Sequence, residues 1–204
     1  MHLACFDLEG VFVPEIWIRF AEETGIAELR LTTRDVPDYD ALMRRRLEIL
    51  DRHGLRLRDI QAVISRMEPL PGAREFLDDL RRRIPVLIVS DTFTQFAGPL
   101  IAKLNFPTLL CNRLEVAPDG KVTGYRLRQE DGKRKVALAM QGLNYRVIAV
   151  GDSYNDVRML TTADHGILFR PPAAVRSEYP SLPVAEDYPA LARLIGGILT
   201  REEP

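Results

Sequence analysis

The sequence predicts an α/β protein with a doubly wound, parallel β-sheet, a small helical domain inserted after the first strand, and a β-hairpin. Two observations lead to this prediction. Short apolar segments alternate with segments of helical periodicity over most of the chain, which is typical of a parallel sheet covered by helices on both faces. Between residues 14 and 69 the alternation stops, and only helical patterns occur there.

The predicted strands are short apolar runs that are bounded by polar or turn residues. They cover residues 3–8, 85–90, 108–111, 146–150 and 166–169. Helical patterns cover residues 74–83, 94–104, 133–143 and 155–163, and a closing helix covers 187–199. Asp119-Gly120 lies between two β-prone segments, which predicts a hairpin over residues 114–125.

The inserted segment has the start and stop signals of three helices. Pro14 opens a helix that runs to residue 23 and is followed by Gly25, and Asp38 caps a helix over 39–53. A third helix is expected over 60–67, started by Asp59. Prolines and a glycine at 69–72 mark the return to the sheet. We therefore expect a core formed by residues 1–13 and 70–204 and a helical domain formed by residues 14–69.

Charge and composition exclude several classes of protein. Lys plus Arg number 28 against 29 for Asp plus Glu, so the net charge is -1 and there is no basic field to hold a nucleic acid. Both cysteines lie in apolar runs and no metal-binding Cys/His spacing occurs. No apolar segment approaches the roughly 18 residues of a membrane helix. These features favour a cytoplasmic protein without membrane or nucleic-acid partners.

Acidic side chains follow the predicted strands. The first strand leads to Asp7 and Glu9, the second to Ser90 and Asp91, and the fourth to the segment 152–156, which begins and ends in Asp. Ligands bind at the carboxyl ends of parallel strands. Carboxylates that meet there repel one another unless a hard cation lies among them, and oxygen ligands without His or Cys favour Mg²⁺.

The same edge of the sheet offers groups that bind a phosphate. The Ser90 hydroxyl and neighbouring N–H groups can donate to phosphate oxygens, and Lys133, at the start of a helix, can supply a positive charge. Each feature alone has a plainer interpretation, because an Asp-x-Glu turn is more often solvated and such a lysine is more often at the surface. Their shared order, spacing and strand-end placement favour a phosphoryl-transfer site.

These motifs resemble those of the haloacid dehalogenase (HAD) superfamily of phosphotransferases. The matching segments are Asp7-Leu8-Glu9-Gly10-Val11, Ser90, Lys133 and Gly151-Asp152-Ser153-Tyr154-Asn155-Asp156. The resemblance implies a HAD-like, Rossmann-like core, with the insertion as its cap domain. Segment 7–17 and Leu110-Cys111 resemble the phosphoserine phosphatase branch, and most closely its bifunctional phosphoserine phosphatase/phosphoserine:homoserine phosphotransferase group.

The resemblance implies a role for each residue of the site. Asp7 would be the nucleophile that forms an aspartyl-phosphate, and Glu9 would be the acid and base. Mg²⁺ would be held by Asp7, the main-chain carbonyl of Glu9 and Asp152. The phosphoryl group would be held by Ser90, Lys133 and Asn155. Asp156 would orient Lys133 or support the metal, and Asp91 would contribute backbone contacts to the substrate.

The resemblance also implies how the cap binds a phosphorylated amino acid. Glu15 would hold the amino group, and Arg46 would clamp the carboxylate in two hydrogen bonds. Arg44, Arg45 and Arg46 are successive helix residues, about 100° apart, so they cannot all face one site. We expect Arg44 and Arg45 to be solvated, and Trp17 and Phe20 to belong to the core of the cap.

The chain departs from the common family pattern at two positions. Most relatives have Asp where this chain has Glu9, and Thr or Ser where it has Val11. The bifunctional group shares the glutamate, whose extra methylene changes the position of the carboxyl group. The choice between water and an alcohol as phosphoryl acceptor is therefore left open.

The predicted function is that of a Mg²⁺-dependent phosphoserine phosphatase that also transfers the phosphoryl group to homoserine. A phosphatase for another small phosphorylated metabolite is one alternative. A non-catalytic phospho-switch is a more distant one, since such proteins lack a large cap after the first strand. The expected partners are small-molecule substrates, and the oligomeric state is left open, a homodimer being one option.

Overall fold

A computed structural model describes residues 1–32, 35–36 and 38–201, and these residues build a seven-stranded sheet. The strand order is β4-β3-β2-β1-β5-β6-β7, with β1 in the middle. Every pair of neighbours is parallel except β3 and β4, which are antiparallel. The strands are β1 His2–Phe6, β2 Val86–Phe93, β3 Thr108–Val116, β4 Val122–Arg126, β5 Arg146–Gly151, β6 His165–Phe169 and β7 Val184–Ala185.

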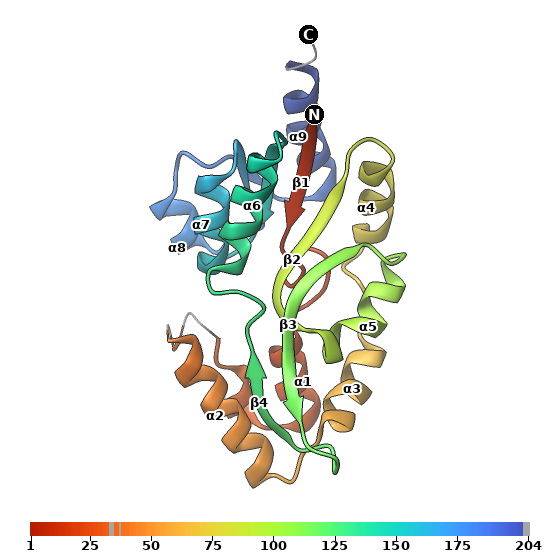
Figure 1. The fold of residues 1–204 in the computed structure, drawn as a ribbon, viewed down its shortest axis with the longest axis vertical. Coiled ribbons are helices and arrows are strands. Elements are labelled where there is room, and N and C mark those ends of the chain that lie inside the picture. The colour runs from red at the N-terminus through yellow and green to blue at the C-terminus, as the bar shows by residue number, and fades with distance from the viewer. Residues whose placement is uncertain (33–34, 37, 202–204) are drawn as a thin grey trace.

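Helices cover both faces of the sheet, which confirms the doubly wound α/β fold (Figure 1). Successive side chains of a strand point to opposite faces, and β1 shows this clearly. Its Ala4 and Phe6 pack in one apolar cluster with α4 (Ala73–Arg81), α5 (Thr94–Lys103) and α9 (Tyr188–Arg201). Its Leu3 and Cys5 pack in a second cluster with α6 (Gly132–Gly142), α7 (Tyr154–Thr162) and α8 (Ala173–Glu178).

The segment between β1 and α4 is helical, as predicted. It forms α1 (Ile16–Thr24), a short 3-10 helix η1 (Ala27–Arg30), α2 (Tyr39–Arg52) and α3 (Leu57–Arg66). The predicted signals at two helix ends are present, because Gly25 has a φ of 70° after α1 and the Asp38 carboxylate accepts a hydrogen bond from Ala41 N–H at 3.1 Å. Residues 33, 34 and 37 of the predicted insertion lie outside the described residues.

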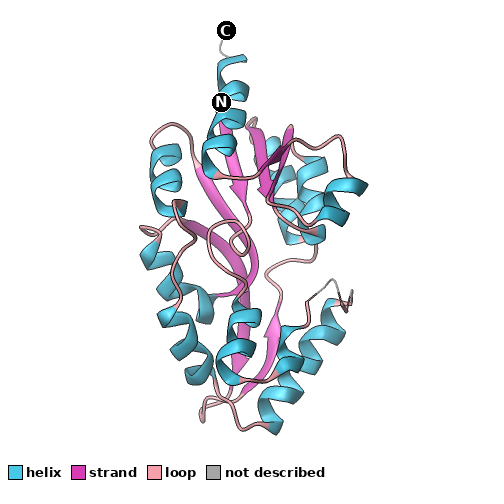
Figure 2. Cartoon of the chain, turned by 180° about the vertical axis from the view of Figure 1, so that it is seen from behind, coloured by secondary structure: helices cyan, strands magenta, loops and turns pink. Residues whose placement is uncertain are grey.

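The hairpin formed by β3 and β4 extends from the sheet along these helices, at the end of the molecule away from both termini (Figures 1 and 2). Leu57 N–H donates to the Gly120 carbonyl at 2.9 Å. Lys121 pairs with Asp51 of α2 at 2.8 Å. The hairpin and the inserted helices are therefore in direct contact, and the division of the chain into the two predicted domains stays a prediction.

Three local predictions are corrected by the structure. The strand predicted over 108–111 and the first arm of the hairpin are one continuous strand, β3. The third inserted helix begins at Leu57, two residues before Asp59. Asp59 therefore lies in its first turn, where its carboxylate accepts from Arg56 N–H at 2.7 Å and caps the helix. The first strand ends at Phe6, so Asp7 lies in the loop that follows it. The short elements η1, α8 and β7 were not predicted from the sequence.

Among the described residues, none of the helices combines the length and the hydropathy that a bilayer-spanning segment requires.

Candidate active site

Asp7 lies at the carboxyl end of the central strand of the sheet. Its N–H donates to the Val150 carbonyl of β5 at 2.9 Å, so the parallel pairing of β1 and β5 fixes its backbone. One carboxylate oxygen of Asp7 accepts from Leu8 N–H at 2.7 Å. The central strand therefore presents the carboxylate at the edge of the sheet where ligands bind in this class of fold.

Lys133 is a buried cation among three carboxylates. Its Nζ lies 2.7 Å from Asp156, 3.0 Å from Asp7 and 3.6 Å from Asp91. Burial lowers the pKa of Lys133, but the nearby Asp156 and Asp7 raise it by more, so the net pKa is well above its usual value. Lys133 is therefore an ammonium ion at every physiological pH, although only 5 % of the residue is exposed.

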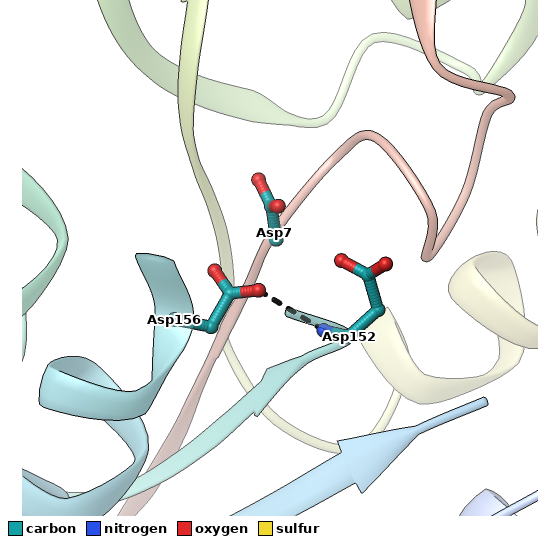
Figure 3. Close-up of side chains that lie close together, drawn as sticks. All are labelled: Asp7, Asp152 and Asp156. Carbon is teal, nitrogen blue, oxygen red and sulfur yellow. Dashed lines mark hydrogen bonds between the residues drawn. The ribbon is translucent and has the colours of Figure 1, made fainter. Parts of the chain in front are cut away.

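Asp156 connects Lys133 to the loop that carries Asp152. Figure 3 shows its bond to the N–H group of Asp152. One of its carboxylate oxygens binds Lys133, and the other accepts from the N–H groups of Asp152 at 3.0 Å and Ser153 at 3.1 Å. Ser153 is the residue before α7, so these bonds also cap the helix. Both oxygens of Asp156 are thus engaged, which favours the orienting role predicted for it.

The carboxylates of Asp7, Asp152 and Asp156 form a compact acidic cluster. Each offers an oxygen that lies within 4.8 Å of the others. Burial, followed by the charge of Asp156, raises the pKa of Asp152 to about 7. Burial raises the pKa of Asp7 well above its usual value, against the lowering effect of Lys133. The charges of Asp156 and Asp152 raise this pKa further.

This cluster fits a hard divalent cation such as Mg²⁺. All three side chains are buried and offer only oxygen ligands, the type that Mg²⁺ prefers. A cation would offset both the burial of these charges and their mutual repulsion, the two causes of the raised pKa values. Since Asp156 is already bound to Lys133 and to two N–H groups, Asp7 and Asp152 are the side chains best placed to hold the ion.

The close approach of Asp152 requires a glycine at position 10. Gly10 has a φ of 77°, in the left-handed region, and a Cβ atom added to it would lie 2.5 Å from the Asp152 carboxyl carbon. Any other residue there would displace Asp152 or the loop after Asp7. The glycine in the Asp7-Leu8-Glu9-Gly10 segment is therefore part of the acidic cluster.

Glu9 connects this loop to the first inserted helix. Its carboxylate accepts a hydrogen bond from the N–H of Ile16, the first residue of α1, at 2.8 Å. Burial, followed by the charge of Glu15, raises the pKa of Glu9 to about 8, although the Ile16 N–H and Arg46 lower it. A carboxyl group with this pKa is largely protonated at neutral pH and can donate a proton.

One partly open cavity of about 90 Å³ brings the predicted residues together. The predicted catalytic and substrate-binding residues that line it are Asp7, Glu9, Glu15, Arg46, Ser90, Asp91, Lys133 and Asn155. Asp152 and Asp156 do not line it, but each has a carboxylate oxygen within 4.8 Å of one from Asp7. Asn155 of α7 donates to the carboxylate of Asp91 in β2 at 3.1 Å, so these two elements meet at the cavity.

Arg46 is the member of the arginine triplet that faces this cavity. It is buried, whereas Arg44 and Arg45 are exposed, as predicted. Its guanidinium lies 4.5 Å from the centroid of the Trp17 ring, and its Nη2 donates to the Leu31 carbonyl at 2.9 Å. Among the described residues its Nε has no hydrogen-bond partner and no carboxylate forms an ion pair with it. This cation is thus positioned for an anionic group that enters the cavity.

A comparison with known families agrees with this geometry. The sequence profile of the haloacid dehalogenase-like hydrolases matches residues 9–161. The chain belongs to this hydrolase family.

Two curated relatives that are named as phosphoserine phosphatases are similar to this chain over most of its length. Phosphoserine phosphatase ThrH of Pseudomonas aeruginosa is 57% identical over 193 residues, which cover 95% of this chain and 94% of the relative. A phosphoserine phosphatase of Pseudomonas syringae pv. tomato is 57% identical over 193 residues, covering 95% of this chain and 81% of the relative.

Solved structures show the same fold. The crystal structure of a phosphoserine phosphatase in apo form aligns with a TM-score of 0.75 and 23% identity, covering 96% of this chain and 98% of that one. A phospho-aspartyl intermediate analogue of a phosphoserine phosphatase aligns with a TM-score of 0.70 and 23% identity, covering 90% and 91% of the two chains. At this level of identity the likeness establishes the HAD fold.

Several cavity residues of the hydrolase were not predicted. Tyr39 donates from its hydroxyl to the Asp91 carbonyl at 3.3 Å, and Thr92 and Phe93 continue the cavity wall beyond Ser90. Trp17, predicted as core of the cap, is buried but also lines the cavity. Thr92 could have been predicted, because it is a polar residue directly after the Ser90-Asp91 pair. Nothing in the sequence distinguishes Tyr39 from any other residue at the start of a helix.

The acidic cluster predicts that Mg²⁺ stabilises the fold through Asp152. At a Mg²⁺ concentration ten times its Kd, we expect a gain of about 1.4 kcal/mol, which corresponds to a rise of about 3–6 °C in Tm for a domain of this size. Asp152→Asn should abolish most of this rise, because it removes a carboxylate ligand. Thermal unfolding with and without Mg²⁺ measures both effects.

The matched control is Asp79→Asn, which changes an exposed aspartate of α4. This variant should retain the full Mg²⁺ effect. An equal rise in Tm for Asp152→Asn and the parent protein would contradict the assignment of Asp152 as a ligand.

Proposed function

We propose that this hydrolase is a Mg²⁺-dependent phosphoserine phosphatase that works through an aspartyl-phosphate on Asp7 and also transfers the phosphoryl group to homoserine. The observation that carries the proposal is the convergence of the nucleophile, the acid and the phosphate-binding groups on one cavity of about 90 Å³. The names of the relatives, phosphoserine phosphatases at 57% identity, support the same substrate.

In the first step a carboxylate oxygen of Asp7 attacks the phosphorus atom, and the bond from phosphorus to the serine oxygen breaks. Glu9 gives its proton to that oxygen. The raised pKa of Glu9, about 8, keeps this proton available at neutral pH. The Lys133 ammonium, 3.0 Å from Asp7, stabilises the negative charge of the transferring phosphoryl group together with the Ser90 hydroxyl.

In the second step Glu9, now ionised, removes a proton from the acceptor hydroxyl. The acceptor oxygen attacks phosphorus, the bond to Asp7 breaks, and the Asp7 carboxylate is restored. Water gives inorganic phosphate, and homoserine gives phosphohomoserine. Because the same cavity holds the leaving serine and the incoming acceptor, an alcohol with an amino acid backbone can use the contacts that serine has left.

Mg²⁺ would be held by the carboxylates of Asp7 and Asp152 and by the main-chain carbonyl of Glu9. When bound, the ion neutralises charge that would otherwise oppose the approach of a carboxylate to a phosphate dianion.

The residues of the cavity wall support an amino acid phosphate as the substrate. Glu15 is an anion for the substrate's ammonium group, and Arg46 is a cation for its carboxylate. The rings of Trp17, Tyr39 and Phe93 limit the room beside them. A small zwitterionic leaving group therefore matches both the charges and the size of this space, which supports phosphoserine over larger phosphorylated metabolites.

Replacement of Arg46 tests the carboxylate contact. Arg46→Met should raise KM for phosphoserine about 30- to 100-fold, since a hydrogen bond to a charged group contributes about 1.5–3 kcal/mol, and this one has two donors. KM for phosphoethanolamine, which lacks the carboxylate, should change little. Steady-state kinetics with the two substrates measure the difference.

Arg45→Met provides the control, because Arg45 is the adjacent residue of the same helix and is exposed. It should leave both KM values unchanged. Equal losses for phosphoserine and phosphoethanolamine in Arg46→Met would mean that Arg46 supports the cavity without binding the carboxylate.

The acceptor is tested by a phosphorus-31 NMR time course with phosphoserine, Mg²⁺ and excess homoserine. We expect phosphohomoserine and inorganic phosphate to rise together as phosphoserine falls. Glu9→Asp should change their ratio, because the shorter side chain moves the base and cannot maintain the 2.8 Å bond to Ile16 N–H. An identical ratio in the parent and the variant would contradict a role of Glu9 in choosing the acceptor.

Two other results of this time course are informative. Inorganic phosphate alone would leave a phosphoserine phosphatase without the transferase activity. Persistence of phosphoserine would overturn the substrate assignment.

A further inference from the structure

A tyrosine from the last helix is bound to the loop that carries the nucleophile. The Tyr188 hydroxyl donates to the Val11 carbonyl at 2.6 Å, and both residues are buried, although 177 positions separate them in the chain. Val11 follows the Asp7-Leu8-Glu9-Gly10 segment directly. Tyr188 lies outside the cavity and outside the acidic cluster, so it has no part in the chemistry described above.

The loop after Asp7 is one tight turn, so a movement of Val11 is transmitted along it. The Leu8 carbonyl accepts from the N–H groups of Phe12 at 2.8 Å and Val13 at 3.1 Å. Gly10 N–H donates to the Val13 carbonyl at 2.8 Å, which closes the turn from the other side. Val11 lies at the tip of this turn, between the residues that these bonds join.

The close contact at Gly10 restricts the position of this turn. The Asp152 carboxylate packs against Gly10 so closely that no Cβ atom fits there. A shift of the turn by a fraction of an ångström therefore changes the separation of Asp7 and Asp152. Because nucleophilic attack is sensitive to such displacements, a group that fixes the turn contributes to the rate.

Tyr188 itself is held rigidly. Its ring stacks between Phe76 of α4, at 5.2 Å between centroids, and Phe169 of β6, at 5.0 Å. The guanidinium of Arg170 lies 5.5 Å from the same ring. Burial raises the pKa of the Tyr188 phenol, so the hydroxyl remains a hydrogen-bond donor. The tyrosine thus joins α9, α4 and β6 to a single carbonyl of the loop.

We propose that Tyr188 is a positioning residue that fixes the loop carrying Asp7 and Glu9 through the Val11 carbonyl. A buried tyrosine hydroxyl requires a partner for its own stability. Here the partner is the tip of the turn between the nucleophile and the first inserted helix. The bond therefore couples the packing of the last helix to the position of the nucleophile.

The test is Tyr188→Phe, which retains the stacked ring and removes only the hydroxyl. We expect kcat for phosphoserine to fall about 3- to 10-fold, the equivalent of one hydrogen bond. KM should stay within about twofold, since Tyr188 does not line the cavity. Hydrogen–deuterium exchange should increase in a peptide spanning residues 7–14 and stay unchanged in one spanning β5, residues 146–151.

Tyr145→Phe is the matched control. Tyr145 is a partly buried tyrosine that packs against the apolar cluster on the other face of the sheet. This variant should keep both kcat and the exchange of residues 7–14 at the parent values. Thermal unfolding of both variants shows how much stability each loses, and all kinetics are measured well below the lower Tm.

The proposal is overturned if Tyr188→Phe leaves kcat and the exchange of residues 7–14 unchanged. It is also overturned if exchange rises equally throughout the chain, because that result would indicate a general loss of stability. The kinetic measurement rests on the proposed function, whereas hydrogen exchange does not. If the parent protein fails to hydrolyse phosphoserine, the proposed function fails, and exchange in residues 7–14 still decides the role of Tyr188.

Discussion

The site depends on the ion pairs that the buried ammonium group of Lys133 forms with Asp7 and Asp156. A buried charge is tolerated only when it is paired and hydrogen-bonded, and removal of one partner leaves the others uncompensated. The pairing at 3.0 and 2.7 Å requires the start of α6 to lie beside the end of β1 and the first turn of α7. The parallel pairing of β1 with β5 brings the end of β1 close to the loop that leads from β5 into α7, so the charges of the site depend on the topology of the sheet.

Lys133 alone cannot balance the acids around it. Asp7, Asp91, Asp152 and Asp156 bring four carboxyl groups to one end of the sheet. Burial, and then repulsion among these groups, raises the pKa values of Asp7 and Asp152. The chain nevertheless packs them closely, since both Gly10 and Gly151 lie where a Cβ atom would collide with an aspartate. This close packing of carboxylates is the kind of arrangement that a divalent cation would stabilise.

The sequence predicted much of this arrangement, because strand ends are a strong constraint. Apolar runs locate the strands, and parallel strands direct Asp7, Ser90 and Asp152 to one edge. Periodicity showed that the three arginines of α2 cannot share a face, but the family resemblance was needed to select Arg46. The contacts of Tyr39 and Tyr188 could not be predicted, since they join segments 52 and 177 residues apart and leave no local pattern.

Two parts of the chain form the walls of the cavity, and hydrogen bonds join these two parts. Arg46 and Trp17 come from the inserted helices, whereas Ser90 and Lys133 come from the sheet and its helices. Tyr39 bridges the two parts through the Asp91 carbonyl, and Glu9 bridges them through Ile16 N–H. A movement of the inserted helices away from the sheet would therefore break both of these hydrogen bonds. The bond from Glu9 to α1 therefore couples the position of this carboxyl group to the position of the inserted helices.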